Sequence, residues 1–149
     1  MISIVQGLLY NLGEDSVTIL VGGIGLEVAV PSRTYHPLAN EVGQTVILFT
    51  HLVVREDSLR LFGFSEKEEE IIFRMLMTVQ GVGPRLALAG LSTLSPELLA
   101  NAIQRDDPDV IARVPGVGKK TAQKIVLELK GKLLADTLPP GLGSVSSLD

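Results

Sequence analysis

Hydrophobic and polar residues alternate in short runs along the first 64 residues, a pattern typical of β-strands. Val17–Val21 is rich in β-branched residues, and Leu26–Val30 alternates with a period of two. The longer run Thr45–Arg55 is followed by the polar stretch Glu56-Asp57-Ser58 and then by the apolar run Leu59–Phe64. Together with the apolar start of the chain, these runs predict five or six short strands, with a polar hairpin tip between the last two.

The apolar residues then change to a helical spacing. Ser65 is predicted as the N-cap of a helix, because acidic side chains are favoured by the helix dipole in the first turns that follow. Those acidic residues are Glu66, Glu68, Glu69 and Glu70. Ser95-Pro96 and Asp107-Pro108 each join a capping residue to a proline at the first helical position, so each predicts another helix start. A last helix is predicted over Thr121–Leu134.

These patterns predict an α+β fold, in which an N-terminal Greek-key β-barrel of the OB-fold type precedes an all-α domain. A small β-sandwich would give a similar strand pattern and stays an alternative. Residues 31–43 are predicted to be irregular, with one short helical turn. We expect domains at residues 1–64 and 65–135, followed by a linker rich in Pro, Gly and Ser over residues 136–149.

One segment of the helical part is repeated 35 residues later in the chain. Val-Gln-Gly-Val-Gly-Pro-Arg-Leu-Ala at residues 79–87 aligns with Val-Pro-Gly-Val-Gly-Lys-Lys-Thr-Ala at residues 114–122. Each copy predicts a helix-hairpin-helix motif, whose glycines allow unusual backbone angles and leave peptide N–H groups uncovered. The central valine fills the gap between the two helices. Exposed N–H groups at the start of the second helix bind anions, and a nearby cation adds charge without reading a base.

The residue spacing excludes two other phosphate-binding loops. A Walker loop needs Gly-x-x-x-x-Gly-Lys-Ser/Thr, but residue 113 is Arg and Lys120 follows Lys119. A dinucleotide fingerprint needs a third glycine, and Leu86 and Thr121 stand at the corresponding positions. One Gly-Val-Gly segment alone could be no more than a tight turn between helices. Two copies, one of them followed by paired lysines, favour non-specific binding to a DNA backbone.

The distribution of charge supports this interpretation. The chain carries a formal net charge of −4, which by itself argues against a nucleic-acid partner. Residues 110–134, however, hold six basic side chains and one acidic side chain. Because binding depends on the local field, this basic segment matters more than the average.

Composition excludes several other classes of protein. The 149-residue chain has no cysteine, which excludes disulfides, thiolate metal sites and cysteine nucleophiles. His36 and His51 are its only histidines and are expected to be structural, so we expect no metal and no cofactor. No apolar run approaches the roughly 20 residues of a membrane-spanning helix. The N-terminus also lacks the basic leader and apolar core of a secretory signal, so a cytoplasmic location is expected.

With these segments in place, the chain resembles the RuvA family, the Holliday-junction-recognition subunits of the bacterial branch-migration motor. The resemblance covers Met1 to about Leu134 and is carried by four segments: Phe49–Asp57, Leu61–Phe64, Gly81–Ala89 and Pro115–Ala122. It implies a homotetramer, in some members two tetramers face to face, that holds a four-way junction open and square during recombination and repair. It implies no catalysis by this subunit, because the RuvB ATPase supplies the force, and it adds the RuvC resolvase as a partner.

The resemblance also implies roles for individual residues. Glu56 and Asp57 match an acidic pin that separates strands at the centre of the junction, although from sequence alone they look like a solvated turn. Arg55 either holds an adjacent phosphate or pairs with a neighbouring acid. Contacts to DNA phosphates are implied for ten residues of the two hairpins: Gly81, Val82, Gly83, Arg85, Gly116, Val117, Gly118, Lys119, Lys120 and Lys124. Arg85 stands where Lys is commoner and keeps the charge.

Four other residues have structural interpretations, and two other functions are alternatives. Lys130 and Lys132 are expected to counter a helix C-terminal dipole, and Met75 and Met77 to lie in the core. The family carries a third domain that docks RuvB, and this sequence lacks it. We expect a truncated or proteolysed form; the alternative is a protein that does not engage RuvB in the usual way. A helix-hairpin-helix DNA glycosylase-type repair enzyme is one alternative, disfavoured by the low aromatic content and the lack of cysteine. A scaffold with no role in DNA binding is the other.

Overall fold

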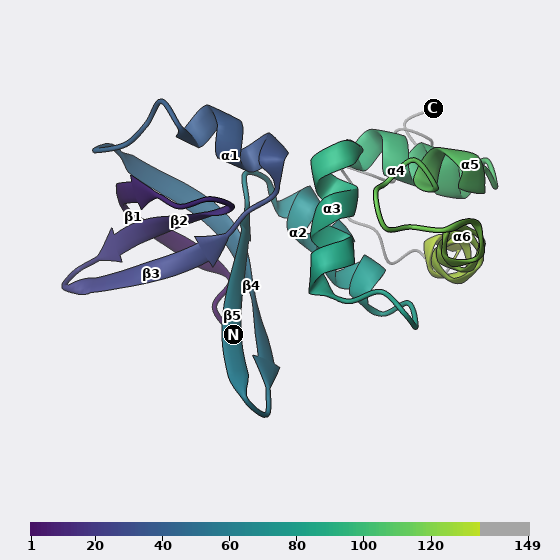
Figure 1. Ribbon diagram of the computed structural model, residues 1–149, viewed down its shortest axis with the longest axis horizontal. Coiled ribbons are helices and arrows are strands. Elements are labelled where there is room, and N and C mark those ends of the chain that lie inside the picture. The colour runs from purple at the N-terminus through teal and green to yellow at the C-terminus, as the bar shows by residue number, and fades with distance from the viewer. Residues whose placement is uncertain (135–149) are drawn as a thin grey trace. The chain divides into compact units, whose positions relative to one another are not determined.

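The computed structural model describes residues 1–134, and the chain divides into two compact units, Met1–Glu70 and Ile71–Asp149. The first unit contains the strands and one short helix, and the second contains the remaining helices (Figure 1). The linker predicted over residues 136–149 lies outside the described residues. Helix α2 (Lys67–Met77) crosses the boundary between the units, so the domain limits proposed from the sequence stay a prediction.

Five strands close into a barrel in the order β1-β2-β3-β5-β4 (Figure 1). They are β1 (Ile4–Leu12), β2 (Ser16–Val21), β3 (Ile24–Ala29), β4 (Thr45–Arg55) and β5 (Ser58–Phe64). Neighbouring strands are antiparallel except β3 and β5, which are parallel. The closed barrel confirms the predicted OB-like fold and excludes the β-sandwich.

Apolar side chains on alternate positions of the strands fill the interior of the barrel. Apolar residues from four strands are at most 1% exposed: Leu9, Val17, Ile19, Val28 and Leu48. Helix α1 (Ser32–Leu38) packs its last residue against this core, and the Tyr35 hydroxyl donates a hydrogen bond of 2.6 Å to the Gly13 carbonyl oxygen. The sequence predicted one helical turn in an irregular segment here. The observed helix is longer than one turn, because these tertiary contacts stabilise a helix that the local sequence alone does not favour.

Strands β3 and β5 close the barrel through very few residue pairs. Strand β5 pairs with β3 through Val28–Leu61 and Ala29–Phe62 only, whereas β4 and β5 stay paired from Phe49–Phe64 out to Arg55–Ser58. A polar pocket lies beside the two β3–β5 pairs, lined by residues of the β2 start, β3 and β5: Asp15, Ser16, Glu27, Ala29, Leu59, Arg60 and Leu61. Beyond the two pairs, β4 and β5 continue as a two-stranded ribbon (Figure 1).

Three helices of the second unit begin close to the predicted positions. They are α4 (Pro96–Gln104), α5 (Pro108–Ile111) and α6 (Lys119–Leu134), which starts two residues before the predicted Thr121. Helix α3 (Pro84–Thr93) follows the first Gly-Val-Gly segment. The N-cap at Ser95 is confirmed, since its Oγ accepts a hydrogen bond from the Leu98 N–H at 3.1 Å. Asp107 precedes α5 as predicted, but its side chain makes no capping hydrogen bond.

The start of α2 differs from the prediction by one residue. The helix begins at Lys67, and the Glu66 N–H just before it donates a hydrogen bond of 3.0 Å to Glu69 Oε1. This is the return half of a capping box, in which the third helical residue reaches back to the N-cap amide. Glu66 therefore takes the capping position that the sequence assigned to Ser65.

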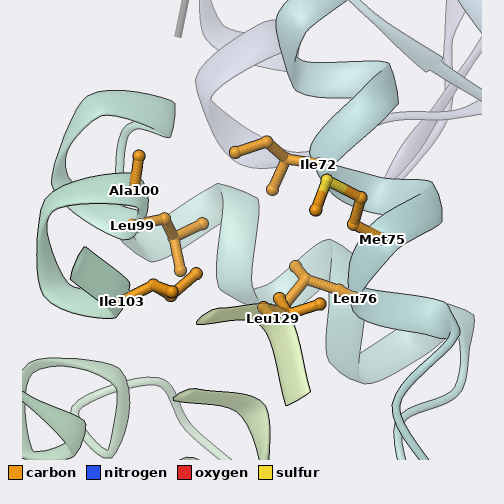
Figure 2. A pocket seen from close by; sticks show the side chains of 7 residues that line it. All are labelled: Ile72, Met75, Leu76, Leu99, Ala100, Ile103 and Leu129. Carbon is orange, nitrogen blue, oxygen red and sulfur yellow. The ribbon is translucent and has the colours of Figure 1, made fainter. Parts of the chain in front are cut away.

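Three helices share the apolar core of the second unit. Figure 2 shows side chains from α2, α4 and α6 converging on a small apolar pocket. They are Ile72, Met75, Leu76, Leu99, Ala100, Ile103 and Leu129. Met75 lies in this core, as predicted. One helix beside each Gly-Val-Gly segment, α2 for the first and α6 for the second, thus contributes to one apolar cluster.

In residues 1–134, no individual helix has the length and apolar composition needed to cross a membrane. Helices α3 and α4 meet those criteria only when taken together, and they are bent by 100° where they join.

Candidate nucleic-acid interface

The two Gly-Val-Gly segments form matching turns between helices. The first glycine of each turn has a left-handed backbone, with φ of +92° at Gly81 and +91° at Gly116. Residues with a Cβ rarely adopt this conformation. In each turn a valine N–H donates at 3.0 Å to a carbonyl oxygen three residues earlier: Val82 to Val79 and Val117 to Val114. The repeat predicted from the sequence is therefore a repeat of structure.

The central valines hold these turns together. Val82 and Val117 are 6% and 8% exposed, so their side chains are packed within the helical unit as predicted. Their N–H groups are already used inside the turn. The sequence included both valines among the phosphate-binding residues, and that assignment stays a prediction.

Free amides remain at the starts of α3 and α6. The first N–H groups of a helix have no partner within it. The first helical hydrogen bonds run from the alanines of the two repeats: Ala87 to Gly83 at 3.0 Å and Ala122 to Gly118 at 2.9 Å. Pro84 has no N–H, whereas Lys119 at the matching position keeps one. Both helix starts favour an anion, and the second offers one more donor.

The glycines leave these amides accessible. No heavy atom outside the local chain lies within 4 Å of the position that a Cβ would take at Gly81, Gly83 or Gly118. A Cβ at Gly116 would instead lie 3.0 Å from Leu86 Cδ1. Three of the four hairpin glycines are therefore open, and the fourth is in contact with a side chain of the other repeat.

Basic side chains flank both hairpins, most densely the second. Lys119, Lys120 and Lys124 are exposed in the first turns of α6, while its opposite face is buried through Ala122, Ile125, Val126 and Leu129. Arg85 is exposed at the start of α3, in the position that corresponds to Lys120. The structure thus brings all four predicted cations to the helix starts that carry the free amides.

Two other lysines of α6 have partners within the protein. Lys130 Nζ lies 3.6 Å from Asp106 Oδ2, and Lys132 Nζ donates a hydrogen bond to Thr78 Oγ1. Asp106 has a left-handed backbone, with φ of +59°. These contacts separate Lys130 and Lys132 from the exposed lysines at the other end of the helix.

The predicted acidic pin lies at the tip of the β4–β5 ribbon. Glu56 and Asp57 form the two-residue turn beyond the Arg55–Ser58 pair, and their side chains are exposed. Arg55 is also exposed, and within residues 1–134 it forms no ion pair, so its two predicted roles stay open. The tip therefore presents two carboxylates and one guanidinium to solvent.

Two further carboxylates are buried, which the sequence did not predict. Glu69 and Glu70 are 6% and 2% exposed. Glu70 Oε1 lies 2.8 Å from Lys67 Nζ, and its Oε2 lies 3.8 Å from His51 Nδ1, in keeping with the expected structural role of His51. Burial raises the pKa of Glu69, against the opposing effects of the Glu66 N–H and the Arg33 guanidinium.

Candidate metal ligands do not gather anywhere in the described part of the chain: no three His, Asp or Glu side chains there could hold an ion together. The hairpins of the second unit instead bring cations beside free amides. That combination suits a polyanion bound through its backbone.

Comparison with known proteins agrees with this description. Residues 1–63 match the family described as RuvA N-terminal domain, and residues 73–132 match the SAM-like helix-hairpin-helix tandem. Three relatives carry the name Holliday junction branch migration complex subunit RuvA. The protein from Herpetosiphon aurantiacus is 48% identical over 97% of this chain and 73% of its own length. The Acinetobacter baumannii protein is 45% identical over 99% of this chain and 72% of its own length. The Haemophilus influenzae protein is 46% identical over 89% of this chain and 64% of its own length. With a duplicated hairpin, a closed N-terminal barrel and relatives this similar over nearly its whole length, the chain belongs to the RuvA family of Holliday junction branch migration complex subunits.

Proposed function

We propose that this chain binds four-way DNA junctions through their phosphate backbone, without sequence specificity, and holds them open and square for branch migration. The ten hairpin residues predicted from the sequence supply the contacts, either directly or, for Val82 and Val117, by shaping the turns. Free amides hold phosphate oxygens at short range, and lysines add attraction at longer range. None of these groups reads a base edge, so affinity is independent of sequence.

The observation that carries this proposal is the duplication of the hairpin together with its cations. A single hairpin turn could serve packing alone. Two turns with the same left-handed glycine, the same internal hydrogen bond and exposed cations at the following helix start fit two phosphates of one duplex arm. The names of the relatives, which place them in a Holliday junction branch migration complex, supply the kind of DNA.

We further propose that four copies assemble through the barrel at residues 1–64, with residues 65–135 binding the DNA arms. Four-fold symmetry then explains a preference for four arms over one. The pins formed by Glu56 and Asp57 meet at the centre, where carboxylates raise the energy of phosphates a few ångströms away. Arg55 binds a phosphate beside the pin. The chain works in the cytoplasm as a non-catalytic subunit beside a RuvB ATPase and a RuvC resolvase.

A competition gel tests this proposal. The chain is bound to a labelled four-way junction and challenged with unlabelled junction or with linear duplex of the same total length. We expect the junction to compete at a much lower concentration than the duplex. Equal competition by both would contradict junction recognition, and absence of binding to either would favour the scaffold with no role in DNA. Strand cleavage of damaged duplex by the purified chain would instead favour the glycosylase-type alternative.

A further inference from the structure

A side chain of the first hairpin motif lies against the turn of the second. Leu86 lies in the first turn of α3, in the first repeat. Its Cδ1 is 3.0 Å from the position that a Cβ would take at Gly116 in the second repeat. Such a separation is shorter than an ordinary van der Waals contact with a Cβ, so Leu86 occupies space that Gly116 leaves vacant by having no side chain. Gly116 therefore meets two requirements, a left-handed backbone and a close neighbour.

This contact is not required by the symmetry of the repeat. The alignment of the two copies places Thr121 where Leu86 stands and Gly81 where Gly116 stands. A symmetric arrangement would put Thr121 against Gly81, yet nothing lies within 4 Å of a Cβ position at Gly81. The contact runs in one direction only, from the first repeat to the second. It is thus a feature of how the repeats are joined, separate from the shape of each hairpin.

The two repeats are also connected through the apolar core of the second unit. There α2 of the first repeat meets α4 and α6 through side chains that surround a small pocket (Figure 2). Helix α3 packs on α2 through Gly90, whose Cβ position lies 3.6 Å from Leu76 Cδ1. The apolar core holds helices of both motifs, α2 and α6. Leu86 contacts the second motif at its turn, beside the free amides.

The spacing between two binding elements governs how well they act together. When two sites are linked, the second contact forms at an effective concentration set by their geometry, and that concentration falls when the link loosens. Preorganised spacing also avoids the entropy cost of ordering the sites on binding. Phosphates along a duplex have fixed separations, so the hairpins gain most if their own separation is fixed.

From this geometry we infer that Leu86 is a positioning residue, which fixes the distance between the two phosphate-binding hairpins by packing against the bare backbone of Gly116. The inference rests on the proposed function for its effect on DNA, and on the contact alone for its effect on the free protein. Leu86 is partly buried and uncharged, so it acts through the spacing of the hairpins rather than through attraction for DNA.

Distance measurement between spin labels tests the positioning role directly, because the chain has no native cysteine. Gln80→Cys and Arg113→Cys place one label on each exposed hairpin loop. Mixing with excess unlabelled chain ensures that each measured pair lies within one molecule. We expect a narrow distance distribution in the parent protein and a broader one after Leu86→Ala, while Leu86→Met restores the narrow distribution.

DNA binding by the same variants supplies the second readout. Leu86→Ala is expected to weaken junction and duplex binding roughly threefold to tenfold, the range seen when a packed coupling contact is lost. The dependence of affinity on salt should keep its slope, because no cation is removed. Leu88→Ala is the matched control, since Leu88 is also partly buried and lies about 200° around the same helix.

The two readouts separate failure of this inference from failure of the proposed function. An unchanged distance distribution in Leu86→Ala, or affinity within twofold of the parent, would overturn the positioning role. If the parent protein bound no DNA, the proposed function would fail while the label distances still tested Leu86. Should Leu86→Ala unfold in a thermal melt, Leu86→Val, which is too short to reach Gly116, gives the same two readouts.

Discussion

At the scale of single residues, the lysines of α6 divide into two groups with different tasks. Lys119 and Lys120 are exposed beside free amides, whereas Lys130 and Lys132 have partners in Asp106 and Thr78. Replacing Lys119 and Lys120 by Gln should weaken junction and duplex binding alike, by roughly a hundredfold if each makes a charged hydrogen bond. The slope of log affinity against log salt should fall by about two. Titrations at several salt concentrations measure both effects.

The control removes the same charge from the same helix. Lys130→Gln with Lys132→Gln lowers the net charge equally but leaves the helix start intact. We expect a small loss of affinity from the weaker overall field. An equal loss in both double variants would show that total charge, and not the hairpin site, attracts the DNA.

Glu69 gives a pH-dependent prediction at the same scale. Burial raises its pKa, so the folded protein holds this proton to a higher pH than the unfolded chain does. The stabilisation from that proton is complete below the ordinary pKa of Glu and is lost as pH rises through the raised value. Glu69→Gln, which stays neutral, should therefore unfold at a higher temperature than the parent at pH 7, on the order of a few degrees.

Thermal melts between pH 4 and pH 8 check this sign. The advantage of Glu69→Gln should shrink as the pH falls and vanish once the parent carboxyl is protonated in both states. Glu68→Gln is the control, because that side chain lies in the same helical turn but is less buried. A gain for Glu69→Gln that did not vary with pH would mean that burial of charge is not its cause.

At the scale of elements, the β4–β5 ribbon carries the acidic tip beyond its last residue pair, Arg55–Ser58. Glu56→Lys with Asp57→Lys should leave junction affinity intact or tighter, because the carboxylates repel nearby phosphates. Discrimination between junction and duplex should weaken, since the repulsion is what disfavours a continuous duplex at the crossover. Competition gels measure both quantities. A loss of junction affinity comparable to that of the lysine variant would rule out the pin.

A second acidic turn on the barrel provides the comparison. Glu14 and Asp15 are adjacent, exposed and placed between β1 and β2. Their replacement by Lys changes the charge of the barrel by the same amount at a different point. If that variant altered discrimination as strongly, position at the ribbon tip would not be the reason.

The elements also indicate how far sequence alone could predict this fold. The strands, the Gly-Val-Gly turns and the Ser95 cap were predictable, because period-two alternation, left-handed glycines and capping side chains act locally. Helix α1 and the buried Glu69 and Glu70 were not, because each depends on what packs against it from elsewhere in the chain. Leu86 gave no signal for the same reason: its contact with Gly116 joins segments 30 residues apart.

At the scale of the whole molecule, each unit carries one part of the proposed function. The barrel bears the acidic tip and many exposed apolar side chains on its strands, among them Ile4, Tyr10, Ile24 and Ile47. The helical unit bears the paired hairpins. Assembly through the barrel would multiply both parts without new contacts to DNA, and binding at several arms raises avidity above that of one chain. Solution mass with and without a junction measures the number of copies.

The short pairing of β5 with β3 has a consequence for motion. Two residue pairs attach that strand to β3, and past them β4 and β5 rely on each other alone. An isolated two-stranded hairpin is barely stable in water, so amide protons near Val54 and Leu59 should exchange with solvent well before those of Leu9 or Ile19. The carboxylates of Glu56 and Asp57 thus lie at the end of a flexible two-stranded hairpin. We expect this hairpin to follow a moving DNA strand while the rest of the barrel keeps its structure.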